Sequence, residues 1–199
     1  VISDDRQSSY ALADRIYNVD GLSRVSLLRV NSRYGRVGTG EFKDASRRMG
    51  HPVAVEVRFE DGHTDFTDQL SKIKTNNSEA IVLWGDSKEL GLIVNQMREM
   101  GMTHPVYACD RAVTAEFLEI AGENANGIIT TCQYNPKGGD QIYEKFRKEY
   151  KERFNEEPGV FAVHSYDAAN ITIKAIQKAG LNRTLIRDLI TDMSTFQNY

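Results

Sequence analysis

The sequence has little of several residue types that would point to a specialised class of protein. It contains two cysteines, Cys109 and Cys132, in 199 residues. They have no CxxC spacing and no nearby histidine, which argues against a zinc site. Buried cysteine behaves as a small apolar residue, so we expect two buried thiols rather than a disulfide. No apolar run approaches the length of about 20 residues that a membrane-spanning helix needs.

An excess of charge of one sign is also missing. The chain has 25 basic and 28 acidic residues, a net charge of -3, so it lacks the basic excess of a nucleic-acid-binding surface and we expect no nucleic-acid partner. The apolar content of 40% is enough for a core. The sequence begins at Val1 with neither a methionine nor a signal peptide, as expected of a mature, cut or trimmed product.

Short apolar runs alternate with helical patterns over the first two thirds of the chain. The runs predicted as strands are Arg24–Val30, Val53–Phe59, Ala80–Trp84, Val106–Cys109 and Gly127–Gln133. A stretch with the apolar spacing of a helix follows each of the first four runs. The pattern predicts an α/β fold with a doubly wound parallel five-stranded sheet and helices on both faces.

The pattern changes after Pro136. The stretch Tyr143–Phe154 places aromatic residues at spacings of three and four, which is typical of an amphipathic helix. Val160–Ala179 and the residues after Asn182 predict two more helices. Without a sheet of their own, these helices need a partner for their apolar faces. That partner is either the first domain or a part of the protein outside this sequence, and exposed faces would favour self-association.

Polar side chains follow three of the predicted strands. Tyr34 comes after the first strand, Asp86 and Ser87 after the third, and Asp110 and Arg111 after the fourth. The carboxyl ends of parallel strands share one edge of the sheet, so we expect these residues on the same rim. A carboxylate there could neutralise the ammonium group of a ligand, and a tyrosine could hydrogen-bond or cover it. Ordinary loop polarity explains the same residues equally well.

Other kinds of site fit the sequence less well. The glycines from Gly35 to Gly40 have GxxGxG spacing, whereas a dinucleotide site needs GxGxxG. His63 lies between Asp61 and Asp65, but a turn followed by a helix cap accounts for this spacing better than a metal site does. No serine lies in a GxSxG elbow. We therefore expect no catalytic group, no metal and no cofactor.

A set of motifs in a fixed order resembles a known family. The motifs are YG followed by a helix, then GHTDF, AIVLWG, QMREMGM, EFLEIAGENANGIITT and SYDAANITIKAIQKAG. Together they span about Arg24 to Leu189, nearly the whole chain. They resemble the type I periplasmic binding proteins, and within them the leucine/isoleucine/valine-binding branch of ABC transporter substrate-binding proteins.

The resemblance implies that the chain is part of a longer, two-lobed protein. In that family two doubly wound lobes are joined by hinge crossings, and ligand is trapped between them. Residues 1–9 would be a hinge or first-lobe segment, and residues 10–135 the second α/β lobe. Residues 136–199 would be the helical return into the first lobe, whose initial sheet is absent.

The resemblance also implies roles for residues of the rim. Tyr34 matches the tyrosine of the family that faces the ligand. Asp86 or Ser87 matches a loop position that is tyrosine in the leucine-binding members, so side-chain selectivity would differ. Asp110 matches the acidic residue that pairs with the α-ammonium group of the ligand, which is glutamate in the family. The donors to the α-carboxylate would lie in the first lobe.

The function implied is that of the extracytoplasmic solute-binding component of an ABC importer, not of an enzyme. It would capture a small-molecule ligand, a branched-chain or related amino acid, and present it to the membrane permease of the transporter. Its location would be periplasmic or extracellular, and any lipid-anchor signal would lie outside this sequence. Two alternatives are a ligand-sensing ectodomain of a receptor and a flavodoxin-like enzyme or response domain.

Overall fold

The chain divides into two compact units. The computed structural model describes residues 4–132, here named the α/β unit, and residues 141–192, here named the helical unit. The predicted change of pattern at Pro136 and the last residue of the predicted fifth strand, Gln133, lie outside the described residues.

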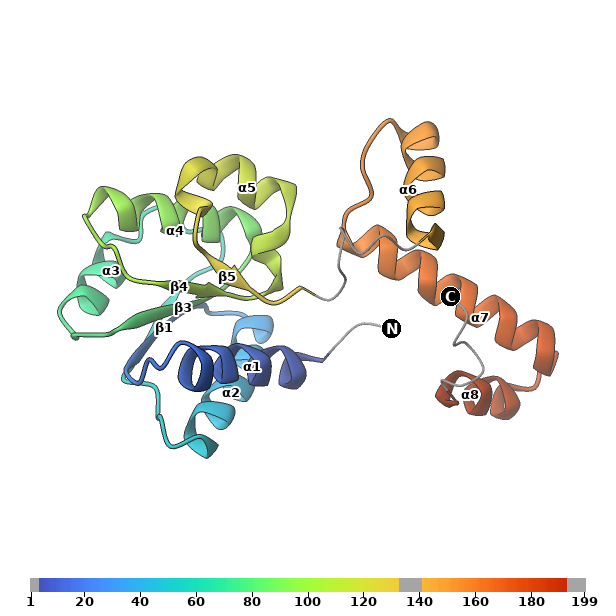
Figure 1. The fold of residues 1–199 in the computed structure, drawn as a ribbon, viewed down its shortest axis with the longest axis horizontal. Helices are drawn as coiled ribbons and strands as arrows, with labels where there is room; N and C mark the ends of the chain where they lie inside the picture. The colour runs from blue at the N-terminus through green and yellow to red at the C-terminus, as the bar shows by residue number, and fades with distance from the viewer. Residues whose placement is uncertain (1–3, 133–140, 193–199) are drawn as a thin grey trace. The chain divides into compact units, whose positions relative to one another are not determined.

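The α/β unit is built on a five-stranded sheet in which all paired strands are parallel (Figure 1). The strand order is β2-β1-β3-β4-β5, so the predicted fold class is confirmed. The strands are β1 (Val25–Val30), β2 (Val55–Phe59), β3 (Ala80–Trp84), β4 (Val106–Ala108) and β5 (Ile129–Thr130). Every residue of β1 and β3 is buried, as expected for central strands that are covered on both faces.

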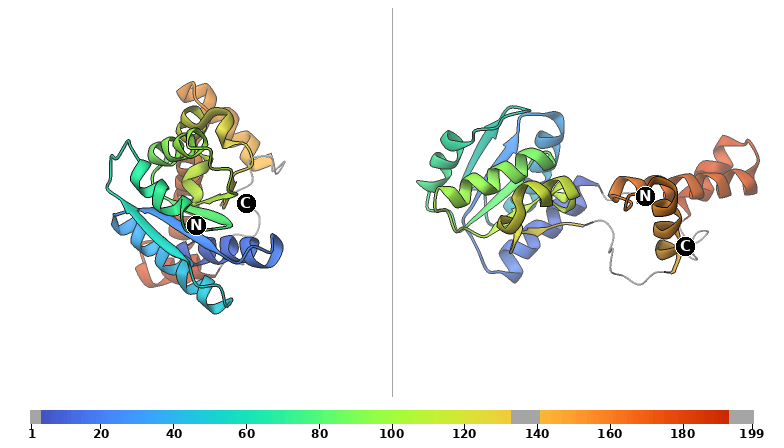
Figure 2. Two further views of the ribbon diagram at one scale, coloured as in Figure 1. Left: turned by 90° about the vertical axis from the view of Figure 1, so that its left-hand side faces the viewer. Right: turned by 90° about the horizontal axis from the view of Figure 1, so that it is seen from above.

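Helices cover both faces of this sheet. In Figure 1, α1 (Asp5–Asp14) and α2 (Arg33–Arg48) lie against one face. The other face carries α3 (Thr67–Lys74), α4 (Ser87–Glu99) and α5 (Ala115–Ala121), and the turned views of Figure 2 show the same two layers. Each layer closes its own apolar core, one around Leu27 and Phe42 and the other around Leu28, Phe66 and Ile93.

The first helix begins earlier in the sequence than its apolar pattern does. The pattern starts at Tyr10, whereas α1 starts at Asp5 because the side chain of Asp4 accepts a hydrogen bond from the backbone N–H of Gln7, at 2.9 Å. A π-helical turn, Arg15–Val19, continues the helix. The polar residues that precede Tyr10 are therefore largely helical rather than irregular.

Two glycines let α2 lie unusually close to the sheet. A Cβ atom on Gly35 would overlap the carbonyl group of Val30, and one on Gly38 would overlap the indole ring of Trp84. By contrast, a Cβ atom on Gly40 would have no neighbour within 4 Å. Gly35 and Gly38 therefore allow α2 to pack closely on the sheet. This close packing fixes the start of α2 at the carboxyl end of β1.

An ion-pair cluster ties β1, β2 and α2 together. The carboxylate of Glu56 accepts from Arg29 Nε at 2.7 Å and from Lys43 Nζ at 2.6 Å. Burial disfavours the ionised form of Glu56, but these two donors outweigh it and lower the pKa to about 2. Arg29 is almost fully buried, so its pairing is needed in the folded state.

The two cysteines lie in different environments. Cys109 is a buried thiol, as expected, and burial raises its pKa to about 11. Cys132 is exposed. The prediction of two buried thiols is therefore wrong for Cys132, because it follows the two-residue edge strand β5 and lines an open hollow beside α1.

The helical unit consists, in its described residues, of α6 (Gln141–Phe154), α7 (Val160–Ala179) and α8 (Arg183–Thr191). Aromatic stacking joins α6 to α7, with the rings of Phe146 and Tyr166 at 4.3 Å between centroids. Large apolar side chains nevertheless remain exposed, among them Phe161, Ile173 and Leu181. Within the parts of the chain that the structure describes, no helix has the length and apolar character to cross a membrane.

Candidate functional site

The order of the strands brings three polar loops together at the carboxyl edge of the sheet. β1, β3 and β4 are consecutive in the sheet, so the loops that follow them are neighbours. Tyr34 lies in the first turn of α2, Asp86 is at the N-cap position of α4, and Ser87 is the first residue of that helix. Asp110 begins a short 3-10 turn, Asp110–Val113, after β4. This edge of an open α/β sheet is where such folds bind ligands.

Tyr34 and Asp110 are in direct contact. The Tyr34 hydroxyl donates a hydrogen bond to Asp110 Oδ1 at 3.0 Å, across 76 residues of sequence. The Tyr34 ring is half-buried and lies 6.1 Å from the ring of Trp84. Burial raises the pKa of Tyr34 above its usual value, and the neighbouring acidic groups Cys109 and Asp110 add to this effect. The phenol therefore stays protonated and acts as a donor to the carboxylate.

Arg111 connects the second and third loops to Tyr34. Its guanidinium group lies over the Tyr34 ring, 4.2 Å from the centroid, and forms an ion pair with Asp86. The side chains of Asp86 and Arg111 are partly exposed, at 41% and 34%. The hydroxyl of Ser87 donates to the backbone carbonyl of Arg111 at 3.2 Å and is buried. The four residues predicted from the sequence thus lie in one cluster.

The sequence pattern gives no indication that Asp5, the first residue of α1, lies near the site. Burial raises the pKa of Asp5, and the nearby negative charge of Asp110 raises it further, while Arg111 opposes the shift. Asp5 therefore brings a further carboxylate into the electrostatic surroundings of Asp110. The signal that could have found it is the capping residue Asp4, which starts α1 early enough to place Asp5 there.

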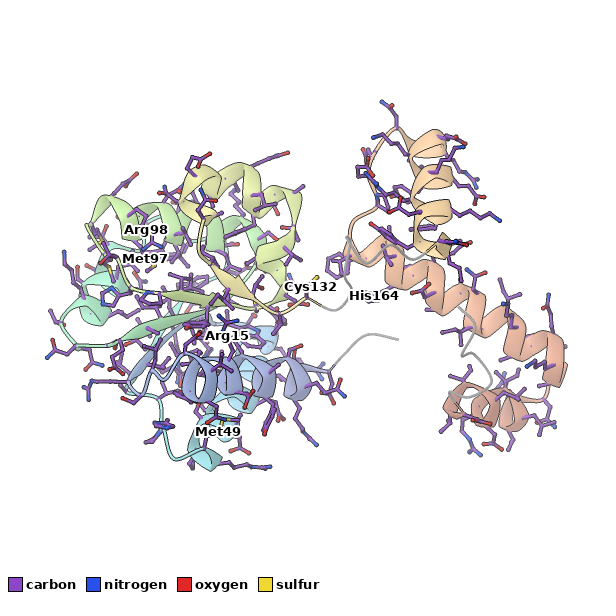
Figure 3. The ribbon with its side chains drawn as sticks, in the orientation of Figure 1. Arg15, Met49, Met97, Arg98, Cys132 and His164 are labelled. Carbon is purple, nitrogen blue, oxygen red and sulfur yellow. The ribbon has the colours of Figure 1, made fainter. Side chains whose placement is uncertain are left out.

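A hollow lies between α1 and the edge strand β5. It has a volume of about 490 Å³ and includes Arg15 and Cys132 among its lining residues, both labelled in Figure 3. Arg15 is the charged residue of this lining, and its Nε donates to Asp20 at 2.8 Å. The hollow therefore has fewer charged side chains than the rim around Tyr34.

The environment of His63 fits the capping interpretation. Asp65 accepts hydrogen bonds from the backbone N–H and the hydroxyl of Thr67, at 3.0 and 2.6 Å. The carboxylate is thereby engaged at the start of α3, as the capping interpretation predicts. Among residues 4–132 and 141–192 there is no group of three or more potential metal ligands.

Comparison of sequences identifies relatives of this chain. The sequence model of a family described as "Periplasmic binding protein" matches residues 1–199. An "Amino acid binding protein" of Pseudomonas aeruginosa is 30% identical over 187 residues, which cover 89% of this chain and 48% of the relative. A "Leucine-, isoleucine-, valine-, threonine-, and alanine-binding protein" of the same organism is 26% identical over 161 residues, 78% of this chain and 42% of the relative.

Comparison of structures finds relatives of the same kind. A leucine binding protein, LivK, of Thermotoga maritima has a TM-score of 0.85 and 32% identity, over 96% of this chain and 55% of that chain. The branched-chain amino acid transporter substrate binding protein LivJ of Streptococcus pneumoniae, solved with isoleucine, has a TM-score of 0.81 and 26% identity, over 95% of this chain and 54% of that chain. This chain thus spans about half the length of the relatives that it matches.

Proposed function

Because this chain belongs to the periplasmic binding protein family, within the branch of leucine-binding and related proteins, we propose that it is part of an extracytoplasmic solute-binding protein of an ABC importer. Residues 10–135 form its second lobe, and residues 136–199 form the return into a first lobe whose initial sheet lies outside this sequence. The hinge or first-lobe segment lies within residues 1–9 and ends where α1 begins, at Asp5. The length of the relatives, about twice that of this chain, supports this division.

The ligand is a small polar molecule, an amino acid. It binds on the rim of the second lobe, and closure of the two lobes buries it before the closed form meets the membrane permease. Asp110 pairs with the α-ammonium group. Closure of the lobes removes water from the site and lowers the local dielectric constant, so the carboxylate attracts a cation more strongly than it does in water. The role is binding rather than catalysis.

The observation that carries this proposal is the hydrogen bond from Tyr34 to Asp110 at the carboxyl edge of β1, β3 and β4. Tyr34 fixes the orientation of the carboxylate by donating to one oxygen, at 3.0 Å. A carboxylate has two oxygens and about four lone-pair positions, so it can accept from more than one donor at a time. Asp86 and Ser87, on the next loop, adjust which side chains the site accepts.

Titration calorimetry on the two-lobed protein that contains this chain tests the proposal. We expect Asp110→Ala to weaken amino-acid binding by about 100-fold or more, because loss of one partner leaves a buried charge uncompensated. The matched control is Asp44→Ala, which removes a carboxylate of α2 that is 47% exposed and pairs with Arg47. Unchanged affinity in Asp110→Ala would contradict the assignment of the site.

A further inference from the structure

Arg111 is held in place by its backbone as well as by its side chain. Its carbonyl oxygen accepts from the hydroxyl of Ser87 at 3.2 Å and from that of Thr114 at 3.1 Å. Its guanidinium group lies against the Tyr34 ring and pairs with Asp86. An arginine fixed on three sides is an ordered part of the rim, unlike a surface arginine that moves freely in solvent.

This position of Arg111 changes what a ligand would meet. A branched aliphatic side chain gains binding energy from contact with apolar walls. Here, a guanidinium group covers a face of the Tyr34 ring, and a carboxylate and a hydroxyl come from the loop after β3. Burying Arg111 and Asp86 under an aliphatic group would remove water from both charges without giving either a new partner, which is costly.

A ligand group that accepts hydrogen bonds would find a better match. A guanidinium group has five N–H donors in one plane, and a single carboxylate engages two of them at most in a bidentate pair. The stacking on Tyr34 fixes that plane, so the edge of the guanidinium group is presented with little loss of side-chain entropy on binding. Donors that Asp86 leaves unused can bind an oxygen of the ligand.

Tyr34 also arranges the two charges of the site. Its hydroxyl contacts Asp110, and its ring face contacts Arg111. An extended ligand that lies along Tyr34 would therefore meet a negative group near the hydroxyl and a positive group over the ring. Such an arrangement is complementary to a molecule with an ammonium group at one end and a carboxylate or amide oxygen at the other.

We propose that Arg111 is the residue that determines ligand specificity, and that it selects amino acids whose side chain ends in a carboxylate or carboxamide over leucine, isoleucine and valine. This inference rests on the proposed function, in which Asp110 binds the α-ammonium group. Arg111 binds the oxygen at the end of the ligand side chain, while its contact with Tyr34 is kept. Asp86 is the residue that holds Arg111 at the rim before the ligand arrives.

The test is a calorimetric panel of glutamate, glutamine, aspartate, asparagine, leucine, isoleucine and valine on the two-lobed protein. We expect at least one acidic or amide amino acid to bind more tightly than all three aliphatic ones. Arg111→Leu is expected to weaken the acidic or amide ligand roughly 10- to 100-fold, as loss of a charge-assisted hydrogen bond does, and to improve leucine binding. Arg111→Lys retains the charge and should restore part of the preference.

A control variant separates a specific effect from a general one. Arg48→Leu changes an arginine of α2 whose side chain is 80% exposed, and it should leave every affinity unchanged. If Arg111→Leu weakens all seven amino acids equally, Arg111 binds the α-carboxylate and the inference is wrong, although the proposed function stands. If Arg111→Leu changes nothing, or if wild type prefers aliphatic ligands, the inference is also wrong. If no amino acid binds to the wild type, the proposed function and the inference fail together.

Discussion

The two units of the chain use apolar residues in opposite ways. In the α/β unit, the large apolar side chains of the strands meet helices on both faces, so residues such as Trp84 and Phe42 are almost fully buried. In the helical unit, few side chains reach that state, and Phe161 and Leu181 are 60% and 90% exposed. A sheet with two layers of helices closes its own core, whereas the three described helices of the helical unit leave much of their apolar surface exposed.

The largest expected effect comes from separating the two units. Residues 4–132 expressed alone should unfold cooperatively in urea, with a slope of roughly 1–3 kcal/mol per molar urea, because their cores are complete. Residues 141–192 alone should lose structure gradually and associate through their exposed apolar faces. Circular dichroism and sedimentation velocity on both fragments measure this. A sharp unfolding transition in a monomeric fragment of residues 141–192 would show that the helical unit also closes its own core, and would contradict the contrast between the two units.

The next largest effect is expected inside the α/β unit, where α2 approaches the sheet. Gly38→Ala should lower the free energy of unfolding by about 3 kcal/mol, because the added methyl group overlaps Trp84 and both neighbours are fixed.

Gly40→Ala is the matched control. This residue lies in the same helix and has open space around its Cβ position, so alanine should be neutral or stabilising by up to about 1 kcal/mol, through its higher helix propensity. Urea unfolding of both variants tests the pair. Equal effects at the two positions would show that close packing of α2 does not depend on glycine.

A smaller effect, which depends on pH, is expected at Glu56. Its pKa is about 2 in the folded state and near 4.5 in the unfolded chain, so its contribution is complete above about pH 4.5 and is lost as the pH falls toward 2. Glu56→Gln should therefore lower the unfolding free energy at pH 7 by about 1–2 kcal/mol, allowing for solvent screening. The difference from wild type should shrink across that pH window. A difference that stays constant with pH would contradict the ion-pair explanation.

The smallest effect is expected at Glu157 in the helical unit. Hydrogen bonds from Arg147 and Lys151 also lower its pKa to about 2. The Glu157 side chain is 45% exposed, however, so solvent screens the pair and little stability depends on it. Glu157→Gln should leave the thermal midpoint unchanged within error at any pH. A loss as large as that of Glu56→Gln would mean that the helical unit is more tightly packed than its exposure indicates.

The arrangement of the α/β unit follows from patterns that are local in the sequence. The run Ala80–Trp84 is apolar throughout and forms β3 with the same bounds. Thr114 accepts from the backbone N–H of Phe117 at 3.2 Å and starts α5, as its capping side chain predicts. Because parallel strands place their carboxyl ends at one edge, the meeting of Tyr34, Asp86 and Asp110 at the rim could also be predicted.

The contacts inside the site could not be predicted in the same way. The stacking of Arg111 on Tyr34 joins residues 77 positions apart and depends on how closely α2 approaches β3, which no local pattern encodes. The sequence therefore places Arg111 on the rim without indicating a role for it. The start of α1 depends on the cap at Asp4, whereas the apolar spacing of this helix begins only at Tyr10.

The contact between Gly38 and Trp84 has a practical consequence for studies of this site. Trp84 is the one tryptophan of the 199 residues, is 1% exposed, and has its ring 6.1 Å from that of Tyr34. Indole emission depends on the polarity of the surroundings, and this indole lies between α2 and the rim. The chain thus carries its own fluorescent reporter, whose wavelength and intensity respond to movement of Tyr34 without any label being added.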